Sequence, residues 1–267
     1  MASGGADFCL TGVTYYLFAR RQAGSGLGAR FVAVVHQRSP LAGVVAAESD
    51  IVRPSDLAGR RLARSAATGW LPDELVACLA ERGIAPPEIV PVGYGEPPRA
   101  LGLGTVDVMA TFLDTTTQQQ PTSGISTRAI HVGHEIYASG LVAADRVPGD
   151  VVSRMVLAVR AGFERQQREP SAGIDEFCRR FPATSPVRAR ETWDLLAPFV
   201  FTGPPVGSMD DGRWTETLAW LAGVHGLAVP SPSTVRRQPY VTACPLASSR
   251  GKDQSTPSTW NRPKELP

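Results

Sequence analysis

The chain has 267 residues, of which 43% are hydrophobic and 19% are charged, and its formal net charge is +2. These values are typical of a globular protein with a buried core, and they exclude disorder along most of the chain. Arginine is scattered along the sequence, whereas a nucleic-acid or anionic-membrane surface needs a concentrated basic face, so the composition disfavours both partners.

Patterns of strand and helix alternate along the first half of the chain. Apolar, extended stretches predict strands at residues 6–12, 30–37, 41–48, 60–66, 88–95 and 106–112, with one or two more within 128–144. Helical periodicity predicts helices at residues 13–22, 73–83, 98–104, 150–170, 173–180, 189–200 and 213–227. This alternation predicts an α/β fold with mostly parallel sheets flanked by helices, the strand 6–12 being buried.

The carboxyl-terminal end differs in composition from the rest of the chain. It is rich in serine and proline from Pro230 onward, and the only lysines (Lys252 and Lys264) and the only asparagine (Asn261) lie in its last part. We therefore expect residues 229–267 to be a disordered tail outside the fold.

A run of small residues, Ser65 to Gly69, stands where a predicted strand meets a predicted helix. The first amides of a helix have no partner within the helix, and small residues let a ligand approach them. The run is therefore a candidate cradle for a polar or anionic group. An ordinary helix cap with a tight turn explains the same residues, because serine and threonine are common at helix starts.

The segment from Ile51 to Phe112 resembles a known family. Its motifs are Asp56-Leu57-x-Gly59 followed by Arg60 to Leu62, the Ser65–Gly69 turn, Gly83-Ile84, and Ala100-Leu101-x-x-Gly104-x-x-Asp107. This order of motifs resembles the type 2 periplasmic solute-binding proteins, in the branch that binds sulfonates, taurine and thiamine pyrimidines. The resemblance extends from about Gly5 to about Leu227.

The resemblance implies two α/β lobes with a ligand cleft at the hinge between them. One lobe would comprise residues 1–46 and 130–228, and the other residues 47–129. The ligand would then contact residues near strand ends: Thr11, Gly12, Gln37, Ser39, Ser65, Ala66, Thr68, Gly69, Trp70, Phe112, Asp114 and Tyr137.

Two features depart from the family pattern. The strand and helix that open other members have no counterpart here, and no secretion signal precedes residue 6. We therefore expect a cytoplasmic protein as the sequence is written, or an extracytoplasmic one if the native start lies upstream. A homodimer or a partner chain that completes the first lobe is a further expectation.

Enzymes are also built on this fold, among them desulfinases with a cysteine nucleophile. Cys9, His36 and Arg38 lie near the ends of predicted strands, and a cysteine activated by histidine beside arginine is a known nucleophile. The alternatives are a buried strand residue for Cys9 and a strand-end cap for His36. Function is therefore expected to be small-molecule binding of the ABC-transporter solute-binding type, or alternatively that of a cofactor-free lyase or biosynthetic enzyme.

The sequence predicts no metal site and no cofactor. The four cysteines show no CxxC pair, and His131 and His134 lie in an extended pattern that would place them on opposite faces. Gly24 to Gly28 precedes a strand rather than a helix, so it predicts a turn and not a phosphate loop. No run of apolar residues is long enough to span a membrane as a helix.

Overall fold

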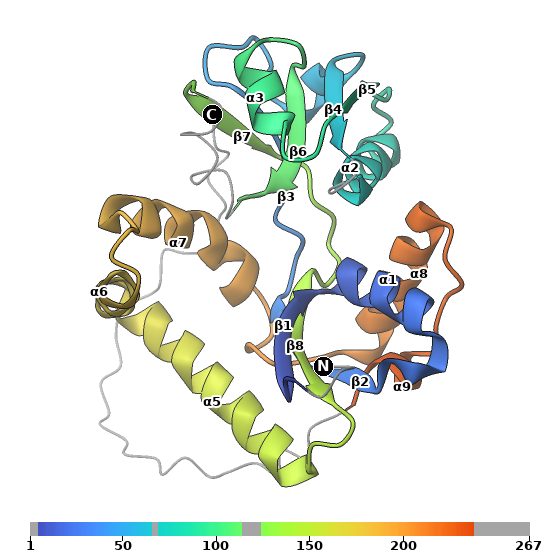
Figure 1. The fold of residues 1–267 in the computed structure, drawn as a ribbon, viewed down its shortest axis with the longest axis vertical. Helices are drawn as coiled ribbons and strands as arrows, with labels where there is room; N and C mark the ends of the chain where they lie inside the picture. Colours follow the sequence, from blue (N-terminus) through green and yellow to red (C-terminus); the bar gives the residue numbers. More distant parts are fainter. Residues whose placement is uncertain (1–4, 66–68, 114–123, 238–267) are drawn as a thin grey trace, which may run out of the picture.

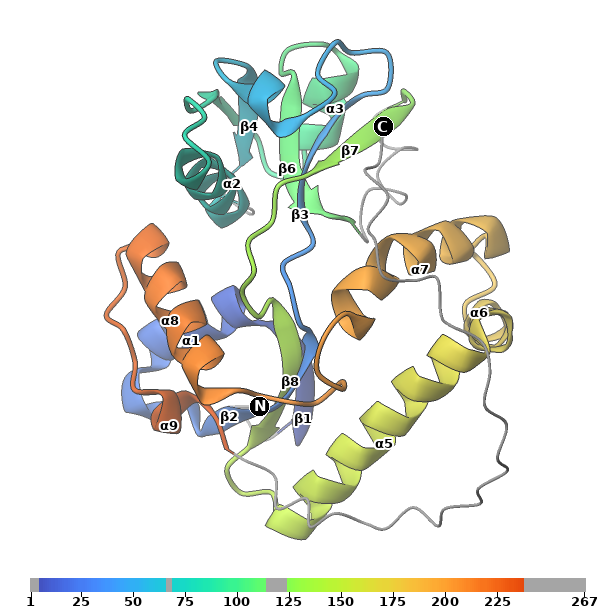
Figure 2. The same ribbon diagram turned by 180° about the vertical axis from the view of Figure 1, so that it is seen from behind.

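The computed structural model describes residues 5–65, 69–113 and 124–237. The chain forms two α/β lobes that lie one above the other and are joined by two extended segments (Figures 1 and 2). Each lobe has its own sheet, with strand order β1-β8-β2 in the first and β5-β4-β6-β3-β7 in the second. The prediction of a two-lobed α/β fold flanked by helices is confirmed.

Most predicted elements are present, with boundaries within a few residues. The strands are β1 (Phe8–Gly12), β2 (Ala29–His36), β3 (Leu41–Ala46), β4 (Arg61–Ser65), β5 (Glu88–Val92), β6 (Val108–Phe112), β7 (Thr127–His131) and β8 (Ser139–Ala144). The α-helices are α1 (Val13–Ala23), α2 (Trp70–Glu81), α3 (Pro97–Gly102), α5 (Gly149–Arg168), α6 (Pro170–Arg180), α7 (Pro186–Phe201), α8 (Asp211–His225) and α9 (Pro232–Val235). Two 3₁₀ helices, η1 (Gly24–Leu27) and η2 (Pro54–Leu57), complete the described elements.

The predicted predominance of parallel strands is wrong for the described sheets. Four of the six strand pairings are antiparallel, and only β4 pairs in parallel, with β5 and β6. The unit β1-α1-β2 does bring its two strands into the same direction, as the alternation predicts. However, β8 returns from the second lobe and lies between them, antiparallel to both.

The boundary between the lobes also lies elsewhere than expected. The prediction grouped residues 41–46 and 130–131 with the first lobe, but β3 pairs with β6 and β7 in the second sheet. The two crossovers are therefore the segments 37–40 and 132–138. We call residues 5–36 and 139–237 the first lobe and residues 41–131 the second lobe.

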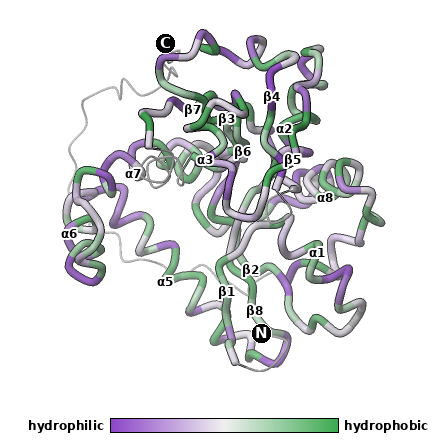
Figure 3. Tube along the Cα trace, turned by 45° about the horizontal axis from the view of Figure 1, so that its top comes forward, coloured by the Kyte–Doolittle hydropathy of each residue, from purple (hydrophilic) through white to green (hydrophobic). Residues whose placement is uncertain are grey.

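Helices cover both faces of the first sheet. On one face Phe31 and Val34 pack with α1 and α8, where Trp214 is fully buried. On the other face Val32 and Leu141 pack against α5. Figure 3 shows hydrophobic segments gathered in the strands, while hydrophobic and hydrophilic residues alternate along α5, as a helix with one buried face requires.

The second lobe has a separate core. The buried side of α2 contributes Leu71, Leu75 and Leu79 to a cluster that also includes Leu62 of β4. The other face of the same sheet packs Val44 and Met109 with α3. Since each sheet has its own apolar clusters, the relative position of the lobes depends on the crossovers and on the contacts between the lobes.

Residues 229–237 belong to the fold, contrary to the expectation of a tail from residue 229. Val235 is fully buried in the first lobe, and the Arg237 amide donates to the Phe31 carbonyl (2.7 Å). Residues 238–267, the rest of the predicted tail, lie outside the described residues.

β1 is an edge strand rather than the buried strand predicted. Its one neighbour among the described strands is β8, Cys9 is exposed, and Leu10 is 61% exposed. The Asp7 carbonyl accepts from the Ala144 amide, so odd-numbered residues of this segment bond toward β8. The main-chain groups of Phe8, Leu10 and Gly12 consequently face outward.

Candidate ligand site at the junction of the two lobes

The two crossovers run side by side and bond to each other. The Ser39 amide donates to the His134 carbonyl (3.1 Å), and His131 Nε2 lies 3.0 Å from the Ser39 carbonyl oxygen. At Gly133 the crossovers are so close that a β-carbon would lie 2.0 Å from that oxygen. The lobes are therefore connected through one narrow, hydrogen-bonded pair of segments.

The amino-terminal ends of two long helices meet where the lobes touch. In the first lobe, β1 ends at Gly12 and α1 begins; in the second lobe, α2 begins at Trp70 after Gly69. The ring centroids of Tyr15 and Trp70 are 4.9 Å apart in an edge-to-face arrangement. The ring centroid of Phe112, at the end of β6, lies 5.6 Å from that of Trp70. An aromatic group from each lobe thus meets beside two helix N-termini.

This junction has a buried hydrogen-bonding group without a partner among the described residues. The first amide of α1 is already used, because the Val13 amide donates to the Ala138 carbonyl (2.9 Å). Glycine caps both helices and offers no side-chain acceptor to the first amides. The Trp70 indole N–H is buried and has no hydrogen-bond partner among the described residues. Buried donors in proteins are normally paired, so an unpaired one beside two helix N-termini marks a place where an acceptor on a ligand would fit.

The small-residue turn is only partly described. Ser65 is buried, and a β-carbon at Gly69 would lie 3.1 Å from the Ser65 carbonyl oxygen, which agrees with a tight turn. The cationic side chain next to the turn, Arg64, pairs with Asp73 of α2 at 2.8 Å. Ala66, Thr68 and Asp114, which the sequence analysis placed at the ligand, lie outside the described residues.

His36 and the end of β1 lie near one another across the first sheet. Ser139 of β8 is in register with both Gly12 and His36, while Thr11 pairs with Gly140. His36 Nδ1 is 2.5 Å from Ser139 Oγ. Burial lowers the pKa of His36 to about 4, so the imidazole is neutral near neutral pH.

The predicted catalytic trio is not brought together. Cys9 is the second residue of β1 and not at its carboxyl end, three residues from Gly12. It therefore lies roughly 10 Å along the sheet from the Gly12–His36 level, and two strands across from His36. Arg38 lies in the first crossover, where it contacts Glu135 (3.3 Å) and the Phe199 ring (5.4 Å). The described geometry gives Cys9 no histidine base.

Gln37, Ser39 and Tyr137 are buried in this arrangement. Gln37 and Ser39 are buried in the first crossover, and Gln37 Nε2 donates to the Ser208 carbonyl (3.3 Å). Tyr137 is 1% exposed, and its hydroxyl accepts from the Asp210 amide (2.9 Å). The guanidinium of Arg213 lies 4.8 Å from the Tyr137 ring, so the first-lobe core encloses this side chain.

His131, the last residue of β7, and His134, in the second crossover, have separate partners among the described residues. His131 lies against the Ser39 carbonyl, whereas His134 Nε2 lies 3.0 Å from Glu81 Oε2. Among the described residues there is no group of three or more histidine, cysteine, aspartate or glutamate side chains that could hold a metal ion.

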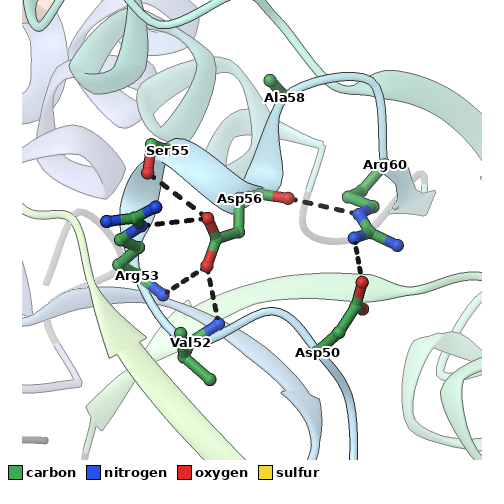
Figure 4. A pocket seen from close by; sticks show the side chains of 7 residues that line it. All are labelled: Asp50, Val52, Arg53, Ser55, Asp56, Ala58 and Arg60. Carbon is green, nitrogen blue, oxygen red and sulfur yellow. Dashed lines mark hydrogen bonds and ion pairs between the residues drawn. The ribbon is translucent and has the colours of Figure 1, made fainter.

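Two hollows lie on the surface of the second lobe, away from the junction. The first, of about 540 Å³, is lined by residues of the segment from Asp50 to Arg60 (Figure 4). Its charged groups are already paired: Asp56 accepts from the Val52 and Arg53 amides, and Arg60 pairs with Asp50 at 2.6 Å. The second is lined by residues between Pro91 and Thr105. Because the charges of the first hollow are paired with each other, few of its polar groups are left to bind a ligand.

The sequence analysis missed Tyr15 and a buried polar cluster formed by Thr14, Glu74 and His225. Tyr15 sits in a helix that reads as an ordinary amphipathic one. The position of Glu74 in the sequence does indicate burial, because it falls on the same face of α2 as Leu71, Leu75 and Cys78. A carboxylate on an apolar face requires a polar partner from elsewhere in the fold.

Within the described ranges, no helix combines the length and the apolar character needed to cross a bilayer.

Two α/β lobes joined by a pair of crossovers, with helix N-termini facing the junction, define the type 2 periplasmic-binding-protein fold. The family model described as NMT1/THI5 like matches residues 1–172. The chain therefore belongs to the NMT1/THI5-like family. No curated protein sequence matches the chain.

Solved structures with this fold support the assignment. The periplasmic aliphatic sulphonate binding protein SsuA from Escherichia coli aligns with a TM-score of 0.66 at 15% identity, over 98% of this chain and 83% of that one. The alkanesulfonate-binding protein SsuA from Xanthomonas axonopodis pv. citri, bound to MOPS, aligns at 0.63 and 18% identity, over 88% and 80%. The desulfurization enzyme DSZB aligns at 0.56 and 15% identity, over 86% and 82%. At these identities the likeness concerns the fold.

Proposed function

We propose that the protein binds a small organic molecule with a polar or anionic group between its two lobes, as a solute-binding protein does. The observation that carries the proposal is the contact of Tyr15 and Trp70 across the lobes, with the Trp70 indole N–H buried and unpaired among the described residues. The names of the two SsuA structures support sulfonates as the first class to test. Lobe closure over the ligand would then follow from bending at the crossovers.

The residues at the junction have distinct roles in this proposal. The amides at the start of α2 would bind the anionic or polar end of the ligand, because the helix dipole is positive there. At α1 the dipole has the same sign, but the Val13 amide already donates to the Ala138 carbonyl (2.9 Å). Trp70 would donate its indole N–H, and the rings of Tyr15 and Phe112 would enclose the organic part. With Arg64 paired to Asp73, main-chain and indole groups rather than a free cation would carry the binding.

The test is a thermal-shift screen with aliphatic and aromatic sulfonates including MOPS, carboxylates and pyrimidines, followed by calorimetry on the compounds that raise the melting temperature. Trp70→Phe keeps the ring contact and removes the N–H donor, so we expect affinity to fall about 10-fold. Trp193→Phe in α7 is the matched control and should bind like wild type. Equal affinities for Trp70→Phe and wild type, or no shift with any compound, would refute the proposed site.

The enzyme alternative has less support. DSZB shares the fold, but Cys9 and His36 lie far apart on the first sheet, so the nucleophile pair expected from the sequence is not formed. A solute-binding role requires only the junction. It would also place the protein outside the cytoplasm, provided that the gene encodes a secretion signal upstream of Met1, which fractionation of cells expressing the native gene would test.

We further propose that a second copy of the chain pairs at the open edge of β1. The outward main-chain groups of Phe8, Leu10 and Gly12, and the exposed Leu10 side chain, support strand addition there. Light scattering should then give a dimer for wild type and a monomer for Leu10→Lys, because a lysine blocks edge pairing. Tyr94→Lys, at an exposed site of the second lobe, should remain dimeric. A monomeric wild type, or a dimeric Leu10→Lys protein, would contradict this pairing.

A further inference from the structure

Three polar side chains from three helices meet in the buried contact between the lobes. Thr14 Oγ1 of α1 donates to Glu74 Oε1 of α2 (2.7 Å), and His225 Nε2 of α8 lies 3.2 Å from the same oxygen. The side chains of Glu74 and His225 are each only 3% exposed. Thr14 and His225 belong to the first lobe and Glu74 to the second, so this cluster joins the two lobes.

The surroundings of the cluster are apolar and also come from both lobes. The ring centroid of Phe18 of α1 lies 5.2 Å from that of His225, and both Phe18 and Trp220 pack against the second-lobe core cluster that includes Leu75. A carboxylate in such surroundings is stable only when it is hydrogen-bonded, so Glu74 depends on its two partners in the first lobe.

A second set of contacts repeats the arrangement two turns further along α2. Glu81 is seven residues after Glu74 and therefore lies on the same face. Its carboxylate accepts from Trp220 Nε1 (2.5 Å) and lies 3.0 Å from His134 Nε2 of the second crossover. One face of α2 thus presents two glutamates, Glu74 to His225 of the first lobe and Glu81 to Trp220 of the first lobe and His134 of the second crossover.

The chemistry of these contacts suits an interface that opens and closes. If apolar side chains filled the same space, separating the lobes would expose them to water at full hydrophobic cost. A hydroxyl, a carboxylate and an imidazole instead regain hydrogen bonds with water when the lobes separate. Their contact therefore favours the closed arrangement by a modest free energy that lobe separation can overcome.

The same helix connects this cluster to the junction of the aromatic rings. Trp70 and Glu74 are four residues apart and lie on one face of α2, and their partners Tyr15 and Thr14 are neighbours in α1. A shift of α2 that changes the Tyr15–Trp70 contact must also change the Thr14–Glu74 bond.

We propose that Thr14, Glu74 and His225 form a clasp that holds the lobes together and is released when they separate. Glu74 is a positioning residue in this role, since it lies one turn beyond the junction. Its effect on ligand affinity rests on the proposed solute-binding function, whereas its effect on lobe separation does not.

The test measures the distance between the lobes in the ligand-free protein. Spin labels are placed at Ala80→Cys on α2 and Ala219→Cys on α8, both exposed positions, with Cys9, Cys178 and Cys244 changed to serine. Cys78 can remain, because burial raises the pKa of its thiol to about 12 and keeps it unreactive. Pulsed electron spin resonance then gives the distribution of distances between α2 and α8.

We expect Glu74→Ala to shift this distribution to longer distances, because it removes the acceptor shared by Thr14 and His225. Asp73→Ala is the control, since Asp73 is next in sequence but pairs with Arg64 inside the second lobe. If Glu74→Ala does not fold, Thr14→Ala combined with His225→Ala removes the partners instead and should give the same shift. An unchanged distribution in the variant that folds overturns the clasp, whatever the outcome of the ligand screen.

Discussion

Replacing Gly133 with alanine is expected to lower the free energy of unfolding by about 3 kcal/mol. The added methyl group would lie 2.0 Å from the Ser39 carbonyl oxygen and 2.9 Å from His131 Nε2. The backbone at Gly133 cannot move away easily, because hydrogen bonds hold it in place. The Gly133 amide donates to the Leu41 carbonyl (3.0 Å), and Arg82 Nη2 donates to the Gly133 carbonyl (3.2 Å). Urea denaturation followed by circular dichroism measures the loss.

A glycine with free space around it provides the control. Gly162 lies within α5 and has no atom near the position of an added β-carbon. Gly162→Ala should raise stability by about 0.5–1 kcal/mol, because alanine favours a helix over glycine. If Gly133→Ala unfolds at the wild-type urea concentration, the two crossovers are not packed as closely as described.

The second large effect expected is a loss of stability on acidification that depends on His36. Burial lowers the pKa of His36 to about 4 in the folded protein, whereas an unfolded histidine titrates near 6.5. As the pH falls between these values, the unfolded state takes up a proton that the folded state does not. The folded state is therefore destabilised, by about 2 kcal/mol between about pH 7 and pH 5.

The measurement compares the pH dependence of two proteins. Wild type should lose about 2 kcal/mol more than His36→Asn over this range, because the carboxylates contribute equally to both and cancel. The pKa of His131 is also lowered, mainly by burial, so its contribution remains in both proteins. Parallel stability curves for wild type and His36→Asn would show that His36 is not buried in neutral form.

Local sequence patterns were sufficient for most individual elements. The apolar face of residues 71–79, followed by Gly83 with its positive φ of 68°, predicts α2 and its end. The β-branched run at 30–37 predicts β2 in the same way. Such signals are local, because a helix or strand is encoded by the periodicity of its own residues.

Strand direction and lobe boundaries depend on contacts that are distant in sequence. Nothing within residues 139–144 shows that β8 inserts between β1 and β2, since its partners are more than a hundred residues away. The predicted lobe boundary at residue 46 was wrong because the apolar pattern of β3 does not show which of the two sheets the strand joins. The actual crossover contains Ser39-Pro40, a turn signal that marks the boundary better.

The candidate site was also predictable only where its residues are marked by local sequence patterns. Gly69, Trp70 and Phe112 stand at strand and helix ends, and the structure brings Trp70 and Phe112 together as expected of neighbouring ends. Tyr137 has the same kind of position in sequence but faces the first-lobe core. The clasp joins residues 14, 74 and 225, and no local pattern indicates a contact across such separations.

The chain enters and leaves the second lobe at two neighbouring positions, and this has an evolutionary consequence. The Val132 amide donates to the Leu41 carbonyl (3.0 Å), and two apolar clusters of this lobe draw their buried members from residues 41–132 alone. Such a segment can be exchanged as a cassette, because recombination at the codons of Leu41 and Val132 would join the chain at two residues that are neighbours in space. The exchange would replace the second-lobe side of the proposed ligand site, provided that the new segment keeps the contacts of α2 with α1 and α8. New ligand preferences could then arise by shuffling instead of by gradual substitution.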